Sequence, residues 1–209
     1  HEGAALRVVE LTAHHYPAAF ADGKRGGSLP VHTALQYQTQ HERVASRVVE
    51  LTAQHYPTAF AQVMLDGSLP VHAALQYQTQ HEGVASRVVE LTAQHHPAAF
   101  AHRILDGSLP VHRALQHQTQ HEGVALRVVE LTAQHHPAGF GLDVLGRKTL
   151  PLRLALENHT AGAIVLRRVV ELTVVHYPAA LNDAGLRASA REAGLGDALE
   201  AAGWGEGAG

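Results

Sequence analysis

The sequence repeats itself at a nearly fixed spacing, and this repetition constrains the fold more than any single residue does. The segments 41–80 and 81–120 differ at only eight of forty positions. A Leu-Pro motif recurs four times, and its prolines lie 40, 40 and 41 residues apart, at Pro30, Pro70, Pro110 and Pro151. A period of this length is typical of solenoids, in which each repeat buries its apolar face against its neighbours.

Each repeat is predicted to form two helices. Pro70 suits the first position of a helix, where the missing N–H of proline costs nothing. Val71, Ala74 and Leu75 then follow at the spacing of one apolar helix face. This pattern predicts a short first helix in each repeat.

The second helix is predicted from about Gln80 to His95. Thr79 and Glu82 have the spacing of a capping box, in which a hydroxyl and a carboxylate each accept a backbone N–H at the helix start. Pro97 follows the helix, and the residue before a proline disfavours helical backbone. The capping word recurs in two other repeats, at Thr39 and Thr119. Every phenylalanine shares one position after this proline and is expected to pack between repeats: Phe20, Phe60, Phe100 and Phe140.

The repeated words resemble those of the ankyrin repeat. Leu-Pro-Val-His-x-Ala-Leu, from Leu69, is similar to the Thr-Pro-Leu-His-x-Ala-Ala of the first ankyrin helix, and Val-Val-Glu-Leu, from Val88, to the Val-Val-x-Leu-Leu of the second. The chain departs from the family in its leucine for threonine, its missing Gly-His after the first helix, and a repeat about seven residues longer than the usual ~33. The resemblance implies an all-α solenoid of stacked antiparallel helix pairs, with a HEAT-like helical repeat as the alternative.

The spacing divides the chain into an array and a degenerate end. The ankyrin-like array covers 1–181, as a partial unit 1–26 and the units 27–66, 67–106, 107–146 and 147–181. Residues 182–203 are predicted to form a degenerate C-terminal capping unit, and 204–209 a flexible tail. Because the chain begins with the mid-repeat word His-Glu-Gly, we expect it to be a fragment cut inside a repeat.

Composition argues against several classes of function. The 16 Lys and Arg face 19 Asp and Glu and form no basic run, so we expect no nucleic-acid partner. No stretch approaches the roughly 18 consecutive apolar residues of a membrane span, so we expect no membrane partner. The absence of cysteine excludes disulfides and thiolate metal sites and leaves the cellular compartment open. Ser46, Ser68 and Ser86 lack a base and an orienting group at a suitable spacing, so we expect no enzymatic activity and no cofactor. We also expect the protein to be a monomer.

The 18 histidines invite a metal hypothesis. The segment that begins at His81 has Ala85 at the position where a HExxH zinc site requires its second histidine. The resemblance instead implies that His32, His72 and His112 hydrogen-bond the backbone of the adjacent turn.

A second set of histidines recurs at the end of the second helix: His15, His55, His95, His135 and His176. Equivalent positions of stacked helices lie about 10 Å apart, which is too far for ligands that share a metal at about 2 Å. We therefore predict no metal site, and a histidine-rich metal- or pH-responsive module stays as an alternative.

The positions at which near-identical repeats differ indicate a surface. Two of them lie four residues apart on the first helix and therefore share a face. The resemblance implies that this helix end and the preceding turn line the concave recognition surface of ankyrin repeats. The chain is thus predicted to be a protein–protein interaction scaffold, with a structural spacer in a longer chain as a further alternative. The predicted partner-binding residues are Thr33, Gln36, Tyr37, Asp66, Ser68, Ala73, Gln76, Tyr77, Asp106, Ser108, Arg113, Gln116, His117, Leu154, Glu157 and Asn158.

Overall fold

The computed structural model describes residues 2–23, 27–37, 40–117, 120–144, 150–158, 163–201 and 204. These residues form helices and turns, and no strand occurs among them. The prediction of an all-α protein is therefore confirmed. The chain divides into two compact units, an N-terminal unit His1–Leu105 and a C-terminal unit Asp106–Gly209.

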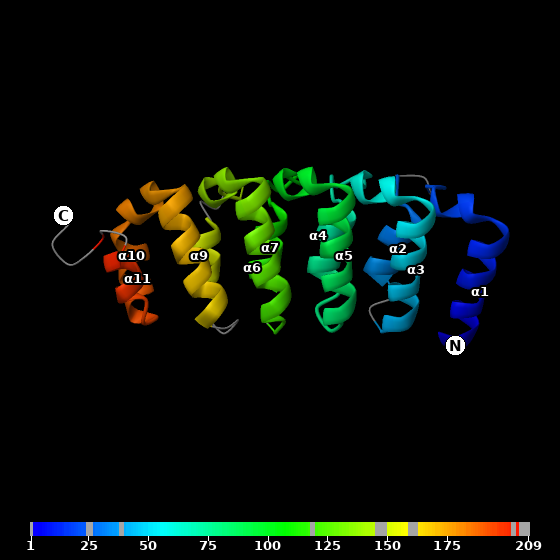
Figure 1. Ribbon diagram of the computed structural model, residues 1–209, viewed down its shortest axis with the longest axis horizontal. Helices are drawn as coiled ribbons and strands as arrows, with labels where there is room; N and C mark the ends of the chain where they lie inside the picture. Colours follow the sequence, from blue (N-terminus) through cyan, green and yellow to red (C-terminus); the bar gives the residue numbers. More distant parts are fainter. Residues whose placement is uncertain are drawn as a thin grey trace. The chain divides into compact units, whose positions relative to one another are not determined.

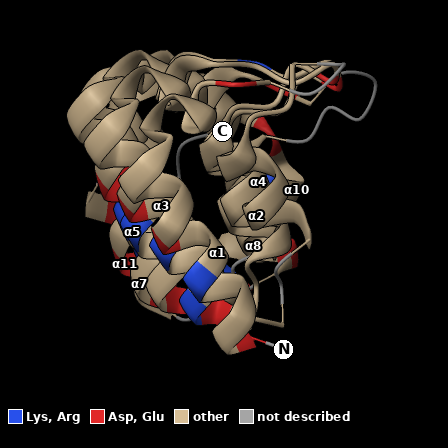
Figure 2. Cartoon of the chain, turned by 90° about the vertical axis from the view of Figure 1, so that its right-hand side faces the viewer, with Lys and Arg blue, Asp and Glu red and all other residues tan. Residues whose placement is uncertain are grey.

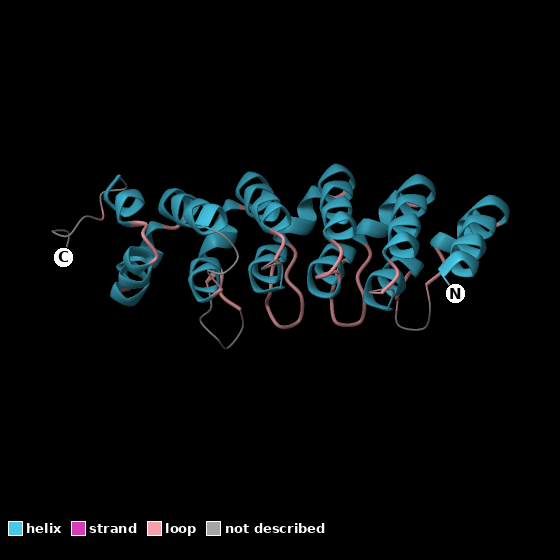
Figure 3. Ribbon diagram, turned by 90° about the horizontal axis from the view of Figure 1, so that it is seen from below, coloured by secondary structure: helices cyan, strands magenta, loops and turns pink. Residues whose placement is uncertain are grey.

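The N-terminal unit alternates long and short helices (Figure 1). Its α-helices are α1 (Glu2–His15), α2 (Pro30–Tyr37), α3 (Glu42–His55), α4 (Pro70–Tyr77) and α5 (Glu82–His95). A 3₁₀ helix follows each long helix: Pro17–Phe20, Pro57–Ala61 and Pro97–Ala101. The long helices α1, α3 and α5 pack on one another in order, and the short helices α2 and α4 form a second layer (Figure 3).

The C-terminal unit has two layers of helices of its own. Its helices are α6 (Pro110–His117), α7 (Glu122–His135), α8 (Pro151–Glu157), α9 (Ala163–His176), α10 (Ala184–Glu192) and α11 (Gly196–Ala201), with 3₁₀ helices Pro137–Gly141 and Pro178–Asn182. Helix α6 packs on α8 and α7 on α9, while α10 contacts α8 and α11 contacts α9. The region predicted as a degenerate capping unit therefore contributes one more helix to each layer.

Trp204 is attached to this last helix pair. Its N–H donates to the carbonyl of Leu199 at 2.9 Å, and Arg191 donates to the Trp204 carbonyl at 3.0 Å. The guanidinium of Arg187 lies 5.7 Å from the centre of the indole ring. The described part of the predicted tail is thus held in place, and the remaining 205–209 lie outside the described residues.

The long helix begins two residues later than predicted. His81 has φ −126° and ψ 80°, which is not helical backbone, and it serves as the N-cap residue of α5 without a capping hydrogen bond from its side chain. Thr79 and Gln80 form a turn before the helix, so the prediction of Thr79 as the N-cap residue is wrong. The equivalent words at Thr39 and Thr119 lie outside the described residues. The predicted end at His95 is confirmed.

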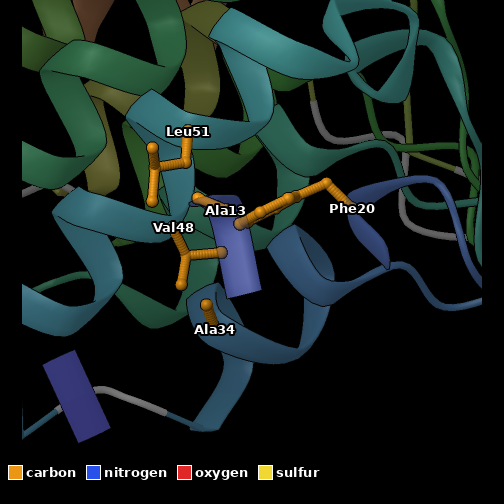
Figure 4. Close-up of a cluster of buried hydrophobic side chains, with 5 residues drawn as sticks. All are labelled: Ala13, Phe20, Ala34, Val48 and Leu51. Atoms are coloured by element: carbon orange, nitrogen blue, oxygen red, sulfur yellow. The ribbon is translucent and has the colours of Figure 1, made fainter. Parts of the chain in front are cut away.

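The phenylalanines occupy the core, as predicted from their shared position. Phe20 is 4% exposed and belongs to a cluster with Ala13, Ala34, Val48 and Leu51, contributed by three helices (Figure 4). Its ring stacks on a histidine of the next repeat.

The same stacking recurs in both units. Phe20 lies 6.2 Å from His55, Phe60 lies 6.2 Å from His95, and Phe140 lies 6.1 Å from His176, as ring-centroid distances. The histidines at the ends of the long helices therefore contribute to packing between consecutive repeats.

A second type of histidine is buried at the start of α2, α4 and α6. His32 Nδ1 accepts the N–H of Leu29 at 3.2 Å, and its Nε2 faces the carbonyl of Gln62 at 3.1 Å. His112 makes the same pair of contacts, with Leu109 at 3.0 Å and Leu142 at 2.9 Å. Because Nδ1 must accept and a carbonyl cannot donate, the contacts require a neutral ring with its proton on Nε2. Burial lowers the pKa of His32 to about 4. These contacts match the structural role that the resemblance implies.

We predict that the free energy of unfolding falls as the pH is lowered from 6.5 towards 4. In this range unfolded His32 takes up a proton, whereas the buried ring stays neutral, so the unfolded state binds more protons and the folded state loses stability. This one ring accounts for a loss on the order of 3 kcal/mol by pH 4. Urea unfolding followed by circular dichroism at several pH values measures the slope. His32→Gln should have a shallower slope than the parent, and equal slopes would contradict the assignment.

Candidate partner-binding surface

The turns before α4 and α6 are each shaped by an Asp-Gly-Ser motif. The carboxylate of Asp66 accepts the N–H of Ser68 and its hydroxyl, both at 2.9 Å. Gly67 has φ +77°, a left-handed conformation that glycine adopts without steric cost. The N–H of Met64 donates to the Ser68 carbonyl at 2.9 Å and closes the turn.

This turn is also bonded to the next repeat. Nε2 of His102 lies 2.8 Å from the carbonyl of Gly67, and the N–H of Leu105 donates to the carbonyl of Asp66 at 3.2 Å. A Cβ on Gly67 would lie 3.6 Å from the Cα of Ile104. Consecutive turns therefore stack on each other and hold the side chains at the start of the short helix in register.

In the N-terminal unit, the predicted residues gather at the ends of α2 and α4. Tyr37 is exposed, with 69% of its surface accessible. Asp66 is also exposed. Four are half-buried: Thr33, Gln36, Gln76 and Tyr77.

In the C-terminal unit, two of the predicted residues hydrogen-bond to other residues of the same unit. Arg113 donates to Asp106 at 2.6 Å, and its side chain is only 14% exposed. Asn158 donates its amide to the Leu115 carbonyl at 3.3 Å and thus ties α8 to α6. Gln116 and Glu157 are exposed, whereas His117 is half-buried.

Four of the sixteen predicted side chains are buried, so they offer no side-chain surface to a partner: Ser68, Ala73, Ser108 and Leu154. The backbone N–H groups of Ser68 and Ser108 bond to the aspartate two residues before them, which turns these serines inward. Ala73 and Leu154 lie on short helices that pack against neighbouring short helices. Sequence variation at these positions therefore falls within the layer of short helices and not on its outer side.

His117 has an unusual electrostatic environment. Burial, and then the positive charge of Arg113, lower the pKa of its imidazole. The residue at this position in the preceding repeat is Tyr77. The variable pair at positions 113 and 117 is therefore electrostatically coupled.

Sequence reasoning missed one polar residue that connects the repeats. Gln78 is fully buried, and its amide donates to the carbonyl of Leu35, 43 residues earlier. It supplies a donor to the C-terminal end of α2, whose last carbonyls have no partner within the helix. The available signal was a glutamine kept directly after the short helix in the near-identical repeats.

The outer face of the long helices carries paired charges. Arg47 on α3 contacts Glu10 on α1 and Glu50 on its own helix. Arg168 on α9 likewise contacts Glu130 on α7 and Glu171. Figure 2 shows such red and blue residues side by side on α1 and α3. The repeated carboxylates thus serve as ion-pair partners on a solvated face, where such pairs contribute little to stability.

No group of three or more potential metal ligands occurs in the part of the chain that the structure describes. Likewise, none of the described helices is long and apolar enough to cross a membrane. In comparisons with known proteins, no family model and no curated sequence matches the chain.

We predict that Arg113→Ala raises the pKa of His117. The substitution removes the positive charge that disfavours the imidazolium, while the contribution of burial remains. Arg113→Lys is the matched control, because it keeps a positive charge at the same position. Titration of the His117 ring resonances by NMR measures both variants. An unchanged or lowered pKa in Arg113→Ala would show that the two side chains are not coupled.

Proposed function

We propose that the chain is a protein–protein interaction scaffold that binds its partner at the ends of its short helices and the turns before them. The observation that carries this proposal is Tyr37, an aromatic side chain that is 69% exposed at a position that varies between repeats. Tyr37 follows the variable residue Thr33 on the same helix face, and tyrosine is common among the residues that dominate binding energies.

The resemblance to ankyrin repeats supports the same surface. The chain has a Leu-Pro-Val-His-x-Ala-Leu word on each of its first three short helices, preceded in the two central repeats by an Asp-Gly-Ser turn. In the ankyrin family, turns and first helices of this kind line the concave recognition surface. We therefore propose an ankyrin-like binding protein, and not an enzyme, with a HEAT-like repeat as the alternative architecture.

Burial limits which of the predicted residues a partner could contact. Tyr37, Gln36, Tyr77 and Gln76 remain available at the ends of α2 and α4. Arg113 is held by its ion pair with Asp106, so it belongs mainly to the framework of the turn.

The two alternative functions have weaker support. His55 and His95 pack on phenylalanine rings, and His32 is buried and neutral, so these histidines have structural roles that require neither metal nor a pH response. A structural spacer would not need an exposed aromatic residue at the variable position.

We predict that Tyr37→Ala leaves the melting temperature within about 2 °C of the parent, because the ring is mostly solvent-exposed, but weakens partner capture about tenfold or more. Tyr16→Ala is the matched control, since Tyr16 is 73% exposed at the end of α1, away from this surface. Both variants and the parent are compared as bait in quantitative affinity capture from an extract of the source cells. If Tyr37→Ala captures the same proteins at the same level as the parent, the proposed surface is wrong.

A further inference from the structure

A row of histidines lies at the C-terminal ends of the long helices of the N-terminal unit. His15 ends α1, His55 ends α3 and His95 ends α5, and all three side chains are exposed. Exposed His14 and half-buried His96 flank the first and the last of them. Helix α2 ends shortly before α3 begins, so the surface proposed above lies at the opposite end of α3 from this histidine row.

Stacking holds two of these rings in place without covering them. The ring of His55 packs on Phe20 with an angle of 25° between the planes, and the ring of His95 packs on Phe60 at 21°. An aromatic face attracts an imidazolium, and the helix dipole favours a positive charge at the C-terminal end of a helix. Protonation of these rings is therefore compatible with the packing between repeats.

The histidines are the groups that change charge near pH 6 at this end of the unit. The segments 11–21, 51–61 and 91–101, which hold the helix ends and the 3₁₀ helices, contain no Asp, Glu, Lys or Arg. Their other titratable residues are Tyr16 and Tyr56. The short helices packed on α3 and α5 add His32 and His72, which are completely buried.

The carboxylates closest along the chain face away from the histidine row. Glu10, Glu50 and Glu90 lie five residues before its histidines, which is about 140° around the helix and about 7.5 Å along it. The first two of them contact Arg47. Asp22 lines a hollow with Pro30 and Thr33 of α2, and the carboxylate of Asp66 accepts two hydrogen bonds from Ser68. This end of the unit is therefore uncharged above neutral pH and cationic in weak acid.

The spacing of the histidine row suits an extended acidic chain. Helix α1 packs on α3 and α3 packs on α5, and packed helices lie about 8–10 Å apart. In a polyproline II chain, residues three positions apart lie on one face at a distance of about 9.3 Å. A segment with Asp or Glu at every third position would therefore present one carboxylate to each imidazolium of the row.

We infer that the histidine row binds an extended acidic protein segment below about pH 6 and releases it at neutral pH. The imidazolium N–H groups donate charge-assisted hydrogen bonds to the carboxylates, and these bonds weaken when the rings lose their charge. The fixed positions of His55 and His95 on phenylalanine rings reduce the entropy that binding must overcome.

The test measures fluorescence anisotropy of a labelled peptide, four repeats of Pro-Pro-Glu, with the full chain. We expect saturable binding at about pH 5.5 that is at least tenfold weaker at about pH 7.5 and that high salt reduces. The matched peptide has the same composition with its glutamates grouped at one end, and it should bind at least about threefold more weakly. Circular dichroism at both pH values checks that the chain remains folded.

Variants of the chain locate the site. Combining His55→Gln with His95→Gln should weaken binding at about pH 5.5 at least tenfold and remove most of its pH dependence. His41→Gln is the matched control at the other end of α3, and its affinity should stay within about twofold of the parent. Combining His55→Lys with His95→Lys should give at about pH 7.5 the affinity that the parent has at about pH 5.5, which a purely structural role would not produce.

Four results would overturn the proposal: no saturable binding at about pH 5.5 up to about millimolar peptide, equal affinity at the two pH values, parent affinity in the glutamine variant, or equal affinity for the grouped peptide. Tighter binding of phosphatidylserine vesicles or single-stranded DNA to the same histidines would also overturn it, because the partner would then be a bilayer or a nucleic acid. Tyr37→Ala should leave binding of the peptide unchanged, so the result is separable from the proposed function.

Discussion

Burial of each repeat's apolar face against the next repeat is the interaction on which both units depend. Val49 and Val89 are completely buried, and so are Phe60 and Phe100. Complete burial of one such side chain is worth about 1.5–3 kcal/mol. A single helix pair cannot bury both of its faces, so its stability comes from its neighbours. Val8 on α1 is 63% exposed, whereas its equivalents Val48 and Val88, which neighbouring repeats cover, are 6% and 0% exposed.

Buried polar contacts then fix the register of this packing. The contacts of His32 with Gln62, Gln78 with Leu35 and Asn158 with Leu115 join residues 30 to 43 positions apart. A buried donor or acceptor without a partner costs about 1–3 kcal/mol, so a slip between repeats would be penalised even where the apolar side chains could still pack. In this way apolar burial drives the stacking of the repeats, and the polar contacts make it specific.

Local sequence patterns were sufficient to predict much of the fold. The start of α4 at Pro70 follows from the restricted backbone of proline, and the end of α5 at His95 follows from Pro97. The start of α5 at Glu82 was not predicted, because Thr79 has suitable capping chemistry but lies in a turn that follows buried Gln78. That burial depends on a partner in another repeat, which a local pattern does not reveal.

The candidate surface was predicted less completely for a related reason. Variation between repeats drew attention to exposed Tyr37 and to buried Ala73 alike, because variation does not distinguish a solvent-facing position from one between neighbouring helices. The pairing of Arg113 with Asp106 was likewise not apparent, since the two residues are seven positions apart and meet only through the geometry of the turn.

Hydrogen exchange of the native chain tests most directly whether stability comes from neighbouring repeats. The word Val-Val-Glu-Leu-Thr occurs at residues 8–12 of α1 and at residues 48–52 of α3, so the two segments have nearly the same intrinsic exchange rates and helix propensities. Helix α3 is packed between α1 and α5, whereas α1 leaves Val8 and Leu11 exposed. We expect the amides of 48–52 to exchange at least about a hundredfold more slowly than those of 8–12, a difference of ~2.7 kcal/mol in opening free energy. Equal protection of the two segments would contradict the account, because helix stability would then be set by local sequence.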